Sequence, residues 1–116
     1  YVTFGGLAAV GQWLSVGDYA FVAGGALCEL DVPPYVIVQG DRARVRAINR
    51  VGLQRNGFAH ETIARLEAVL RAIHRDTPRA VALHPFLDSP HPEVRRLVAA
   101  LLADRPFKRN PANMLK

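Results

Sequence analysis

Apolar residues recur every six positions through the first part of the chain. One register holds Phe4, Val10, Val16, Val22 and Cys28, and a second holds Ala8, Leu14, Ala20, Ala26 and Val32. A helix repeats every 3.6 residues and a plain strand every two, so neither explains this period. Two inward positions per hexad, one aliphatic and one mostly small, predict a prism-shaped parallel β-helix in which each hexad forms one short strand and one corner.

Small residues follow the first register, and the glycines among them are Gly5, Gly11 and Gly17. We expect them at the corners, where glycine allows backbone angles that a Cβ would penalise. The spacing therefore predicts that residues 1–32 are the last coils of a hexapeptide solenoid. Such solenoids need about three or more repeats, and Tyr1 is already in register, so we expect further coils before it.

Two prolines, Pro33 and Pro34, directly follow the last position of the hexad repeat. Both lack a backbone donor, so we expect the ladder of strands to end there. Residues 35–40 then have the composition of a short extended segment that ends at glycine. Residues 41–56 form a basic connector. Arginine stands at every second position from Arg42 to Arg46, which predicts an extended stretch with these side chains on one exposed face. Residues 49–56 are expected to form a loop or a first helical turn.

The period becomes helical from about residue 60. One face is apolar and contains Ile63, Leu66, Val69, Leu70 and Ile73. On the exposed side we expect the i,i+4 ion pairs Glu61–Arg65 and Glu67–Arg71. Ala59 is a poor N-cap, so packing must support the start of this helix.

Two further helical segments follow. Thr77 resembles an N-cap with Pro78 at the first helical position, and Pro85 limits or kinks the helix that they open. Pro92 opens a third helix with an amphipathic stripe, which contains Val94, Leu97, Val98, Leu101 and Leu102. The chain thus divides into the end of a β-helix with its terminating strand (1–40), a basic connector (41–56), a C-terminal α-helical domain (57–104) and a loosely ordered basic tail (105–116).

Charge follows the same division. The chain has 116 residues, 15 Lys or Arg and 10 Asp or Glu, and a formal net charge of +5. Residues 1–40 contain no basic residue and three acids, whereas residues 41–116 contain all 15 basic residues and seven acids. The second part therefore carries a net charge of +8, which suits phosphate, nucleic acid or an acidic protein as a partner.

The composition also limits the compartment and the chemistry. No apolar run approaches the roughly 20 residues of a membrane span, no charged segment with a following apolar stretch suggests secretion, and the single Cys28 fits a reducing compartment. We expect a cytoplasmic protein without stable membrane insertion. Cys28 lies in an inward register, so we expect it to pack as a small hydrophobe.

Catalytic and metal-binding patterns are missing from the sequence. The histidines have no ligand spacing and no cysteine cluster nearby, so we expect no metal and no cofactor; they are His60, His74, His84 and His91. No Ser-His-Asp pattern, phosphate loop or Rossmann glycine fingerprint is present.

Two stretches carry a resemblance to a known family. Residues 31–40 read Asp-Val-Pro-Pro-Tyr-Val-Ile-Val-Gln-Gly, and residues 52–58 read Gly-Leu-Gln-Arg-Asn-Gly-Phe. Together with Gly5, Gly6 and Gln12, they resemble the C-terminal part of UDP-N-acetylglucosamine O-acyltransferases, which catalyse the first step of lipid A biosynthesis. The likeness runs from Tyr1 to about Arg75 and continues more weakly to the end.

The resemblance implies a homotrimer of left-handed β-helices, each with a C-terminal helical domain. It also implies transfer of a 3-hydroxyacyl chain from acyl carrier protein to the glucosamine 3-hydroxyl of UDP-N-acetylglucosamine. The general-base histidine of the family belongs to coils before Tyr1, so we expect this chain to be inactive by itself. Acyl carrier protein is strongly acidic, and the basic half of the chain is its expected landing site.

Four positions match the family's functional residues. The resemblance implies that Gln12 lies beside the substrate, that Gly24 helps to set the acyl-chain length, and that Asn49 and Arg55 lie near the nucleotide. The residues alone also allow a surface role for Gln12, a corner for Gly24 and a turn brace for Asn49.

The sequence departs from the family pattern at three positions. Gly11 stands where the family has a histidine, Val51 where an acid is familiar, and Asn56 where the family has a second basic residue. The loss of one charge beside a pyrophosphate weakens binding by about 1–3 kcal/mol.

Two other interpretations remain open from the sequence. The chain could belong to another hexapeptide acyltransferase that acts on an amino sugar or a small amine, which the residues before Tyr1 would decide. It could also be a non-catalytic basic module for interaction or nucleic-acid binding. Aromatic and basic residues are not interleaved, so we expect no nucleic acid as a partner.

Overall fold

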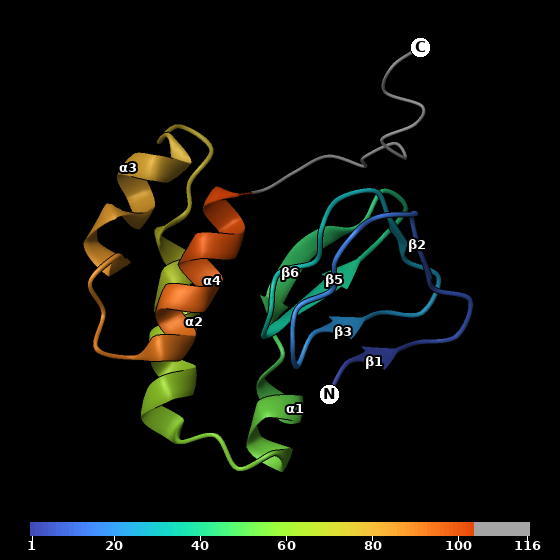
Figure 1. Cartoon of the computed structure of the whole chain (residues 1–116), viewed down its shortest axis with the longest axis horizontal. Helices are drawn as coiled ribbons and strands as arrows, with labels where there is room; N and C mark the ends of the chain where they lie inside the picture. Colours follow the sequence, from blue (N-terminus) through green and yellow to red (C-terminus); the bar gives the residue numbers. More distant parts are fainter. Residues whose placement is uncertain (104–116) are drawn as a thin grey trace.

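Short parallel strands at the start of the chain stack as rungs, each in register with the strand three hexads later (Figure 1). The computed structural model describes residues 1–103, and the predicted tail at 105–116 lies outside them. β1 (Thr3–Phe4) pairs with β3 (Phe21–Val22), and β2 (Ala9–Val10) pairs with β4 (Leu27–Cys28). On a third side, Val16 bridges Val32 in parallel. Three hexads therefore separate the first stacked rungs, β1 from β3 and β2 from β4.

Both inward registers are confirmed where one coil covers another. The most buried members are exposed by 5% or less: Ala20, Val22, Ala26, Cys28 and Val32. Phe4 belongs to the first coil and is 54% exposed. Burial raises the pKa of the Cys28 thiol above its usual value.

The expectation that the ladder ends at the prolines is wrong. β5 (Val36–Gln39) follows them and pairs in parallel with β3, Phe21 opposite Ile37. The turn between these rungs is shorter than the full three hexads that separate Thr3 from Phe21. Pro33 and Pro34 lie outside the strands in this shortened turn, where their missing donors interrupt no ladder bond.

The corners have left-handed backbone angles, but not at the expected residues. Leu7, Trp13 and Tyr19 have φ of 61°, 66° and 62°, and Gly25 continues the same regular spacing with φ of 74°. Gly5 and Gly17 are required for space instead. A Cβ on Gly5 would lie 2.3 Å from the Gly24 nitrogen, and one on Gly17 would lie 2.3 Å from the Pro34 nitrogen.

Residues 41–56 contain a strand and a helix. β6 (Arg44–Ile48) pairs antiparallel with β5 and completes the strand order β1-β3-β5-β6. Arg44 and Arg46 are exposed and Ile48 is buried, which confirms the predicted alternation for these two arginines, whereas Arg42 lies in the turn before the strand. α1 (Arg50–Arg55) follows directly, so the helical alternative for this stretch is confirmed.

The remaining helices follow the predicted segments with small differences. They are α2 (His60–Ala72), α3 (Arg79–Leu83), the short 3-10 helix η1 (His84–Phe86) and α4 (Pro92–Leu102). Ala59 makes no side-chain cap, as expected. Pro78 rather than Thr77 is the N-cap of α3, and α3 ends shortly before Pro85. Leu102 is 42% exposed, so the prediction that it belongs to the buried stripe of α4 is wrong.

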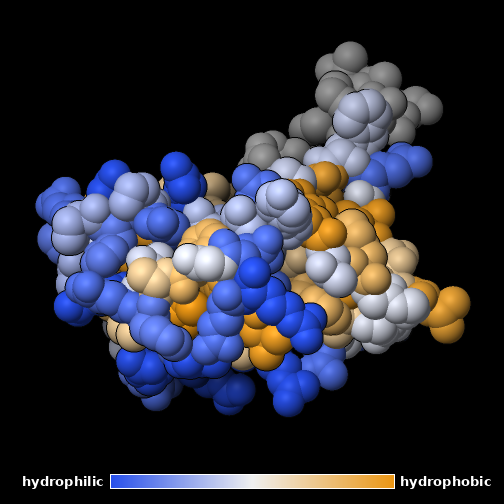
Figure 2. All heavy atoms as spheres, turned by 90° about the horizontal axis from the view of Figure 1, so that it is seen from below, coloured by the Kyte–Doolittle hydropathy of each residue, from blue (hydrophilic) through white to orange (hydrophobic). Residues whose placement is uncertain are grey.

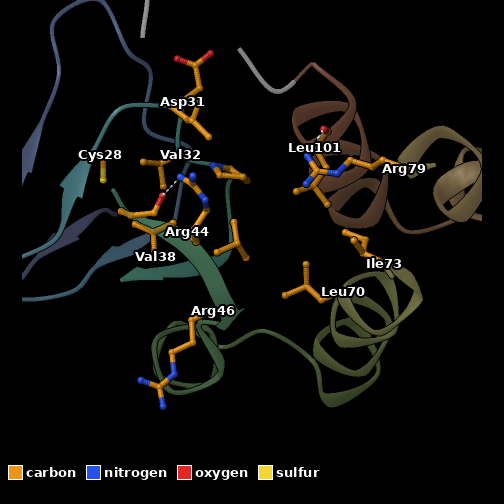
Figure 3. A pocket seen from close by; sticks show the side chains of 14 residues that line it. Cys28, Asp31, Val32, Val38, Arg44, Arg46, Leu70, Ile73, Arg79 and Leu101 are labelled. Atoms are coloured by element: carbon orange, nitrogen blue, oxygen red, sulfur yellow. Dashed lines mark hydrogen bonds between the residues drawn. The ribbon is translucent and has the colours of Figure 1, made fainter. Parts of the chain in front are cut away.

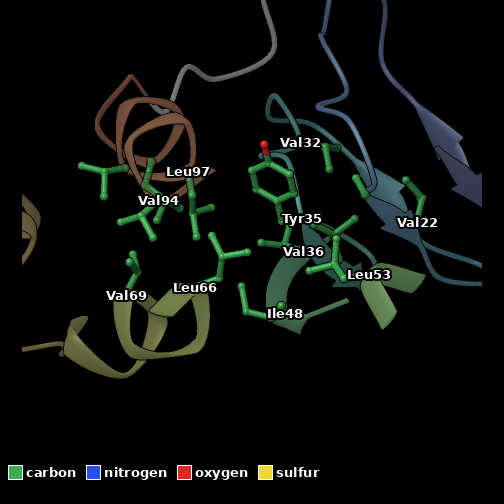
Figure 4. Packing of buried hydrophobic residues seen from close by; sticks show 14 of the residues in the cluster. Val22, Val32, Tyr35, Val36, Ile48, Leu53, Leu66, Val69, Val94 and Leu97 are labelled. Carbon is green, nitrogen blue, oxygen red and sulfur yellow. The ribbon is translucent and has the colours of Figure 1, made fainter. Parts of the chain in front are cut away.

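One hydrophobic core joins the rungs to the helices (Figure 4). Leu66 of α2 and Leu97 of α4 face Val36 of β5 and Ile48 of β6, and all four are exposed by 5% or less. Full burial of such a side chain contributes about 1.5–3 kcal/mol. The helices thus hold the last rungs and β6 in place.

Aromatic rings form a column along one corner. Tyr19 stacks on Tyr1 with ring centroids 5.5 Å apart and on Tyr35 at 6.3 Å. Phe58, just before α2, packs edge-on against Tyr19 at 4.8 Å. This column ties the corner of successive coils to the start of the helical part. Within residues 1–103, no helix has the length and apolar character of a membrane span.

Candidate functional site

The four candidate site residues lie at three different corners of the coil. Gln12 is in an exposed turn with Trp13. Gly24 stacks on the corner of the coil before it, where the Gly25 nitrogen donates to the Gly6 carbonyl at 2.8 Å. Asn49 is attached to the corner that contains Tyr19. A single copy of the chain therefore does not bring all four residues into one cavity; it joins only Asn49 and Arg55, which share α1.

Gly24 has little room for a side chain. A Cβ there would lie 3.3 Å from the Gly6 carbonyl oxygen, which is tighter than an ordinary contact. The residue is exposed, and its φ is not left-handed, unlike that of Gly25. The corner itself therefore favours a small residue at position 24, beside the role in acyl length that the resemblance implies.

Asn49 is almost fully buried, with 8% of its surface exposed, and is hydrogen-bonded through both side chain and backbone. Its Nδ2 donates to the Tyr19 carbonyl at 2.9 Å, and its Oδ1 accepts from the Gly52 nitrogen at 3.3 Å as the N-cap of α1. Its backbone nitrogen donates to the Tyr35 carbonyl at 2.8 Å. Asn49 thus fixes the start of α1 to the aromatic corner.

Gly52 makes this capping arrangement possible. A Cβ on Gly52 would lie 2.4 Å from Nδ2 of Asn49, so any larger residue would displace the cap. Sequence reasoning missed this contact, because the two residues stand in a stretch without a clear pattern.

Arg55 is exposed in the last turn of α1, with its guanidinium available to a ligand. Asn56 follows as the C-cap, and its Nδ2 donates to the Gly52 carbonyl at 2.7 Å. Where the resemblance expects a second basic residue, this chain therefore has a side chain that closes the helix. Val51, at the position of a familiar acid, is 57% exposed on the same helix.

The basic surface is more neutralised than the local sequence predicts. Asp41 accepts from the backbone nitrogen of Arg42 at 2.8 Å, and it is Glu29 that lies 3.7 Å from the Arg42 guanidinium. Arg50 binds Glu67 through two nitrogens, Nε donating to Oε2 at 3.1 Å. Both glutamates are distant in sequence from the arginines they contact, so sequence neighbours could not reveal them.

The predicted ion pairs within α2 are replaced by pairs between elements. Glu67 binds Arg50 of α1 instead of Arg71. Glu61 lies 3.8 Å from Nε2 of His91, the N-cap of α4, instead of pairing with Arg65. Among residues 1–103, no cluster of three or more His, Cys, Asp or Glu side chains could hold a metal ion.

Sequence reasoning also missed a groove between the coils and the helices (Figure 3). Its walls include Cys28 and Val38 on the coil side and Leu70 and Leu101 on the helix side. The periodic patterns predicted that Cys28, Leu70 and Leu101 face inward. They carried no signal that the two sets would leave an open cavity between them.

The sequence matches a family profile described as UDP-N-acetylglucosamine O-acyltransferase, domain 2, over residues 31–108. Curated relatives named acyl-(acyl-carrier-protein)–UDP-N-acetylglucosamine O-acyltransferase include one from Myxococcus xanthus, 45% identical over 75 residues. That alignment covers 65% of this chain and 29% of the relative. A second, from Synechocystis, is 40% identical over 92 residues, 78% of this chain and 33% of the relative. The chain thus spans about a third of the length of these relatives.

Solved structures agree with this match. The UDP-N-acetylglucosamine acyltransferase of Arabidopsis is 29% identical with a TM-score of 0.79, over 88% of this chain and 38% of that one. The Moraxella catarrhalis O-acyltransferase is also 29% identical, with a TM-score of 0.78, over 90% of this chain and 42% of that one. Since the family profile covers well over half of the 116 residues, the chain belongs to the UDP-N-acetylglucosamine O-acyltransferase family.

Proposed function

We propose that the chain is the C-terminal portion of an acyltransferase that moves a 3-hydroxyacyl chain from acyl carrier protein to the 3-hydroxyl of UDP-N-acetylglucosamine, in lipid A biosynthesis in the cytoplasm. The observation that carries the proposal is the match of residues 31–108 to the family, since it spans the shortened turn, α1 and the helices together. The names of the curated relatives supply the donor and the acceptor.

The finer architecture is part of the proposal. We assign residues 1–40 to the end of a left-handed β-helix, 41–56 to a basic connector, 57–104 to a C-terminal helical domain and 105–116 to a tail. Parallel rungs that recur every three hexads and the TM-scores of 0.78 and 0.79 support this assignment. The connector, with β6 and α1, then joins the two larger parts.

A homotrimer explains how residues from three corners serve one site. Gln12 and Gly24 lie at different corners from Asn49 and Arg55, so they meet only if copies of the chain pack side by side. Figure 2 shows hydrophobic residues gathered over the coil half and hydrophilic residues over the helical half. Large side chains exposed on the coils include Phe4, Leu7, Trp13 and Leu27, at 41–94%. Such an apolar surface favours contact with other copies.

Within this assembly each candidate has a role that its position allows. Arg55 binds the pyrophosphate, because a guanidinium pairs strongly with phosphate oxygens. Asn49 positions α1 and, through it, Arg55. Gln12 contacts the substrate, and Gly24 leaves the acyl slot open. The rigid coil supplies the positioning on which acyl transfer depends. The base that takes the hydroxyl proton comes from outside residues 1–103.

The proposal is tested by an acyl-transfer assay on the full-length protein with acyl carrier protein as the donor. We expect transfer to UDP-N-acetylglucosamine, and Arg55→Gln to raise the KM for this nucleotide about tenfold, the effect of one charged hydrogen bond. Arg71→Gln is the matched control, because Arg71 is exposed on α2. Transfer to another amino sugar but not to this nucleotide, or equal effects of both variants, would refute the proposal.

A further inference from the structure

The groove between the coils and the helices combines an apolar lining with positive charge. It has a volume of about 270 Å³ and opens to the surface. Cys28, Val32 and Val38 line it on the coil side, and Leu70, Ile73 and Leu101 line it on the helix side (Figure 3). An apolar ligand portion would therefore be contacted from both sides.

The volume sets the size of that apolar portion. An apolar cavity of about 150 Å³ binds benzene, which has six carbon atoms. At the same density, the volume of about 270 Å³ accommodates roughly ten carbon atoms. An apolar chain of medium length therefore fits the groove, whereas an apolar group of twice that size does not.

The charged side chains of the lining select an anion. Three arginines and one acid, Asp31, belong to the groove. Arg44 of β6 and Arg79 of α3 approach it from opposite sides, whereas Arg46 points away and donates to Gln39 (Figure 3). One Arg44 nitrogen donates to the Ala43 carbonyl at 3.3 Å, which uses one of the five N–H donors of the group.

The ends of two helices act against an anion, and Arg79 offsets one of them. α2 and α4 both end beside the groove, and the carbonyls of a helix C-terminus carry partial negative charge. One Arg79 nitrogen donates to the Leu101 carbonyl at 3.0 Å, so the guanidinium neutralises the end of α4. The Arg44 charge on the facing wall then remains to attract a carboxylate.

We propose that this groove binds a carboxylate that carries an unbranched apolar chain of about ten carbons. The chain lies between Val38 and Ile73, and the carboxylate meets the guanidinium of Arg44. Both parts are needed: a neutral chain leaves the arginine without an anionic partner, and a short carboxylate leaves the apolar walls uncovered. The inference does not depend on the acyl-transfer proposal, because it uses only the lining of this groove.

Titration calorimetry of the full-length protein with sodium decanoate tests the inference, with decanol and butyrate as probes of the two parts. We expect decanoate to bind at least about tenfold more tightly than either, the effect of one charged hydrogen bond or of a few buried methylenes. Arg44→Gln and Ile73→Asp should each weaken decanoate binding by about the same factor. Arg71→Gln is the control, because Arg71 is exposed on α2 outside the groove and should leave binding unchanged.

Three results would overturn the inference. Decanoate could fail to bind at millimolar concentration, or decanol could bind as well as decanoate. Decanoate could also bind with an affinity that neither Arg44→Gln nor Ile73→Asp changes, which would place its site elsewhere in the protein. Because Arg44 is an exposed residue of β6, its substitution tests the site without threatening the fold.

Discussion

Left-handed corners place residues with side chains in a conformation that usually belongs to glycine. Leu7, Trp13 and Tyr19 have φ of 61–66°, which costs an ordinary residue about 1–2 kcal/mol. The stacked coils impose this geometry at these corners, and at Tyr19 the aromatic column adds contacts that offset the cost. The sequence could not reveal it, because the usual signal, glycine, stands at only one of the four evenly spaced corners, at Gly25.

The glycines of the coils differ in how much a side chain would cost. We expect Gly17→Ala to lower the free energy of unfolding by about 1–3 kcal/mol, because its Cβ would collide with the backbone of Pro34 and force neighbouring coils apart. Gly6→Ala is the matched control, since no atom lies within 4 Å of its added Cβ. Denaturant unfolding of both variants measures the difference, and equal midpoints would contradict the close packing of the shortened turn.

Gly24 gives a prediction about substrate choice. Gly24→Met should shift the preference of the full-length enzyme toward shorter acyl donors, because the longer side chain would fill the proposed slot. Gly24→Ala should change the preference less, although its Cβ already lies 3.3 Å from the Gly6 oxygen. A competition assay with acyl carrier proteins of different chain length measures the profile. An unchanged profile in Gly24→Met would show that Gly24 serves only the geometry of its corner and does not set the acyl-chain length.

The elements show where sequence patterns succeed and where they stop. The hexad period and the stripe at Val94, Leu97 and Leu101 are local, so they predict the coils and α4 correctly. The partners of Glu61 and Glu67 come from other elements, and the rule for i,i+4 pairs therefore chose the wrong ones. The candidate site is predicted only as single residues, because the single chain keeps its corners apart and they would meet only in the proposed trimer.

The pair between α1 and α2 can be tested against the one that the sequence predicts. A double-mutant cycle on Arg50 and Glu67 should give a coupling energy of about 0.2–1 kcal/mol, since both side chains are partly exposed. The same cycle on Arg71 and Glu67 should give about zero, because Glu67 is turned toward α1. Chemical denaturation of the variants in both cycles measures the two energies, and a larger coupling to Arg71 would contradict the structure.

At the scale of the whole molecule, one core makes the coils and the helices interdependent. Leu66→Ala should reduce the free energy of unfolding by about 2–5 kcal/mol, the cost of a cavity at a fully buried leucine. Leu87→Ala, at a residue 43% exposed, should cost much less. We expect hydrogen exchange to quicken in β5 and β6 as much as in α2. Faster exchange confined to the helices would show that the coils and the helices unfold as two separate units.

The basic surface of the whole molecule gives a prediction about the donor. Reversing Arg42, Arg44 and Arg46 to Glu should raise the KM for the acylated carrier protein about tenfold and weaken its salt dependence, because attraction to an acidic partner is lost. Reversing Arg65, Arg71 and Arg75, which lie on α2 and just after it, changes the net charge equally and is the control. If only the KM for the nucleotide rises, docking of the carrier protein lies elsewhere.

The shortened turn before β5 has a consequence for how the chain finds its alignment. Identical hexads allow a growing coil to slip by one repeat and still bury similar side chains, since nothing in a uniform ladder distinguishes one neighbour from the next. The turn with Pro33 and Pro34 breaks this uniformity, because it is shorter than the three hexads that separate β1 from β3. It places Pro34 against Gly17, where no Cβ is in the way, and so gives an otherwise uniform repeat one fixed end from which the coils align.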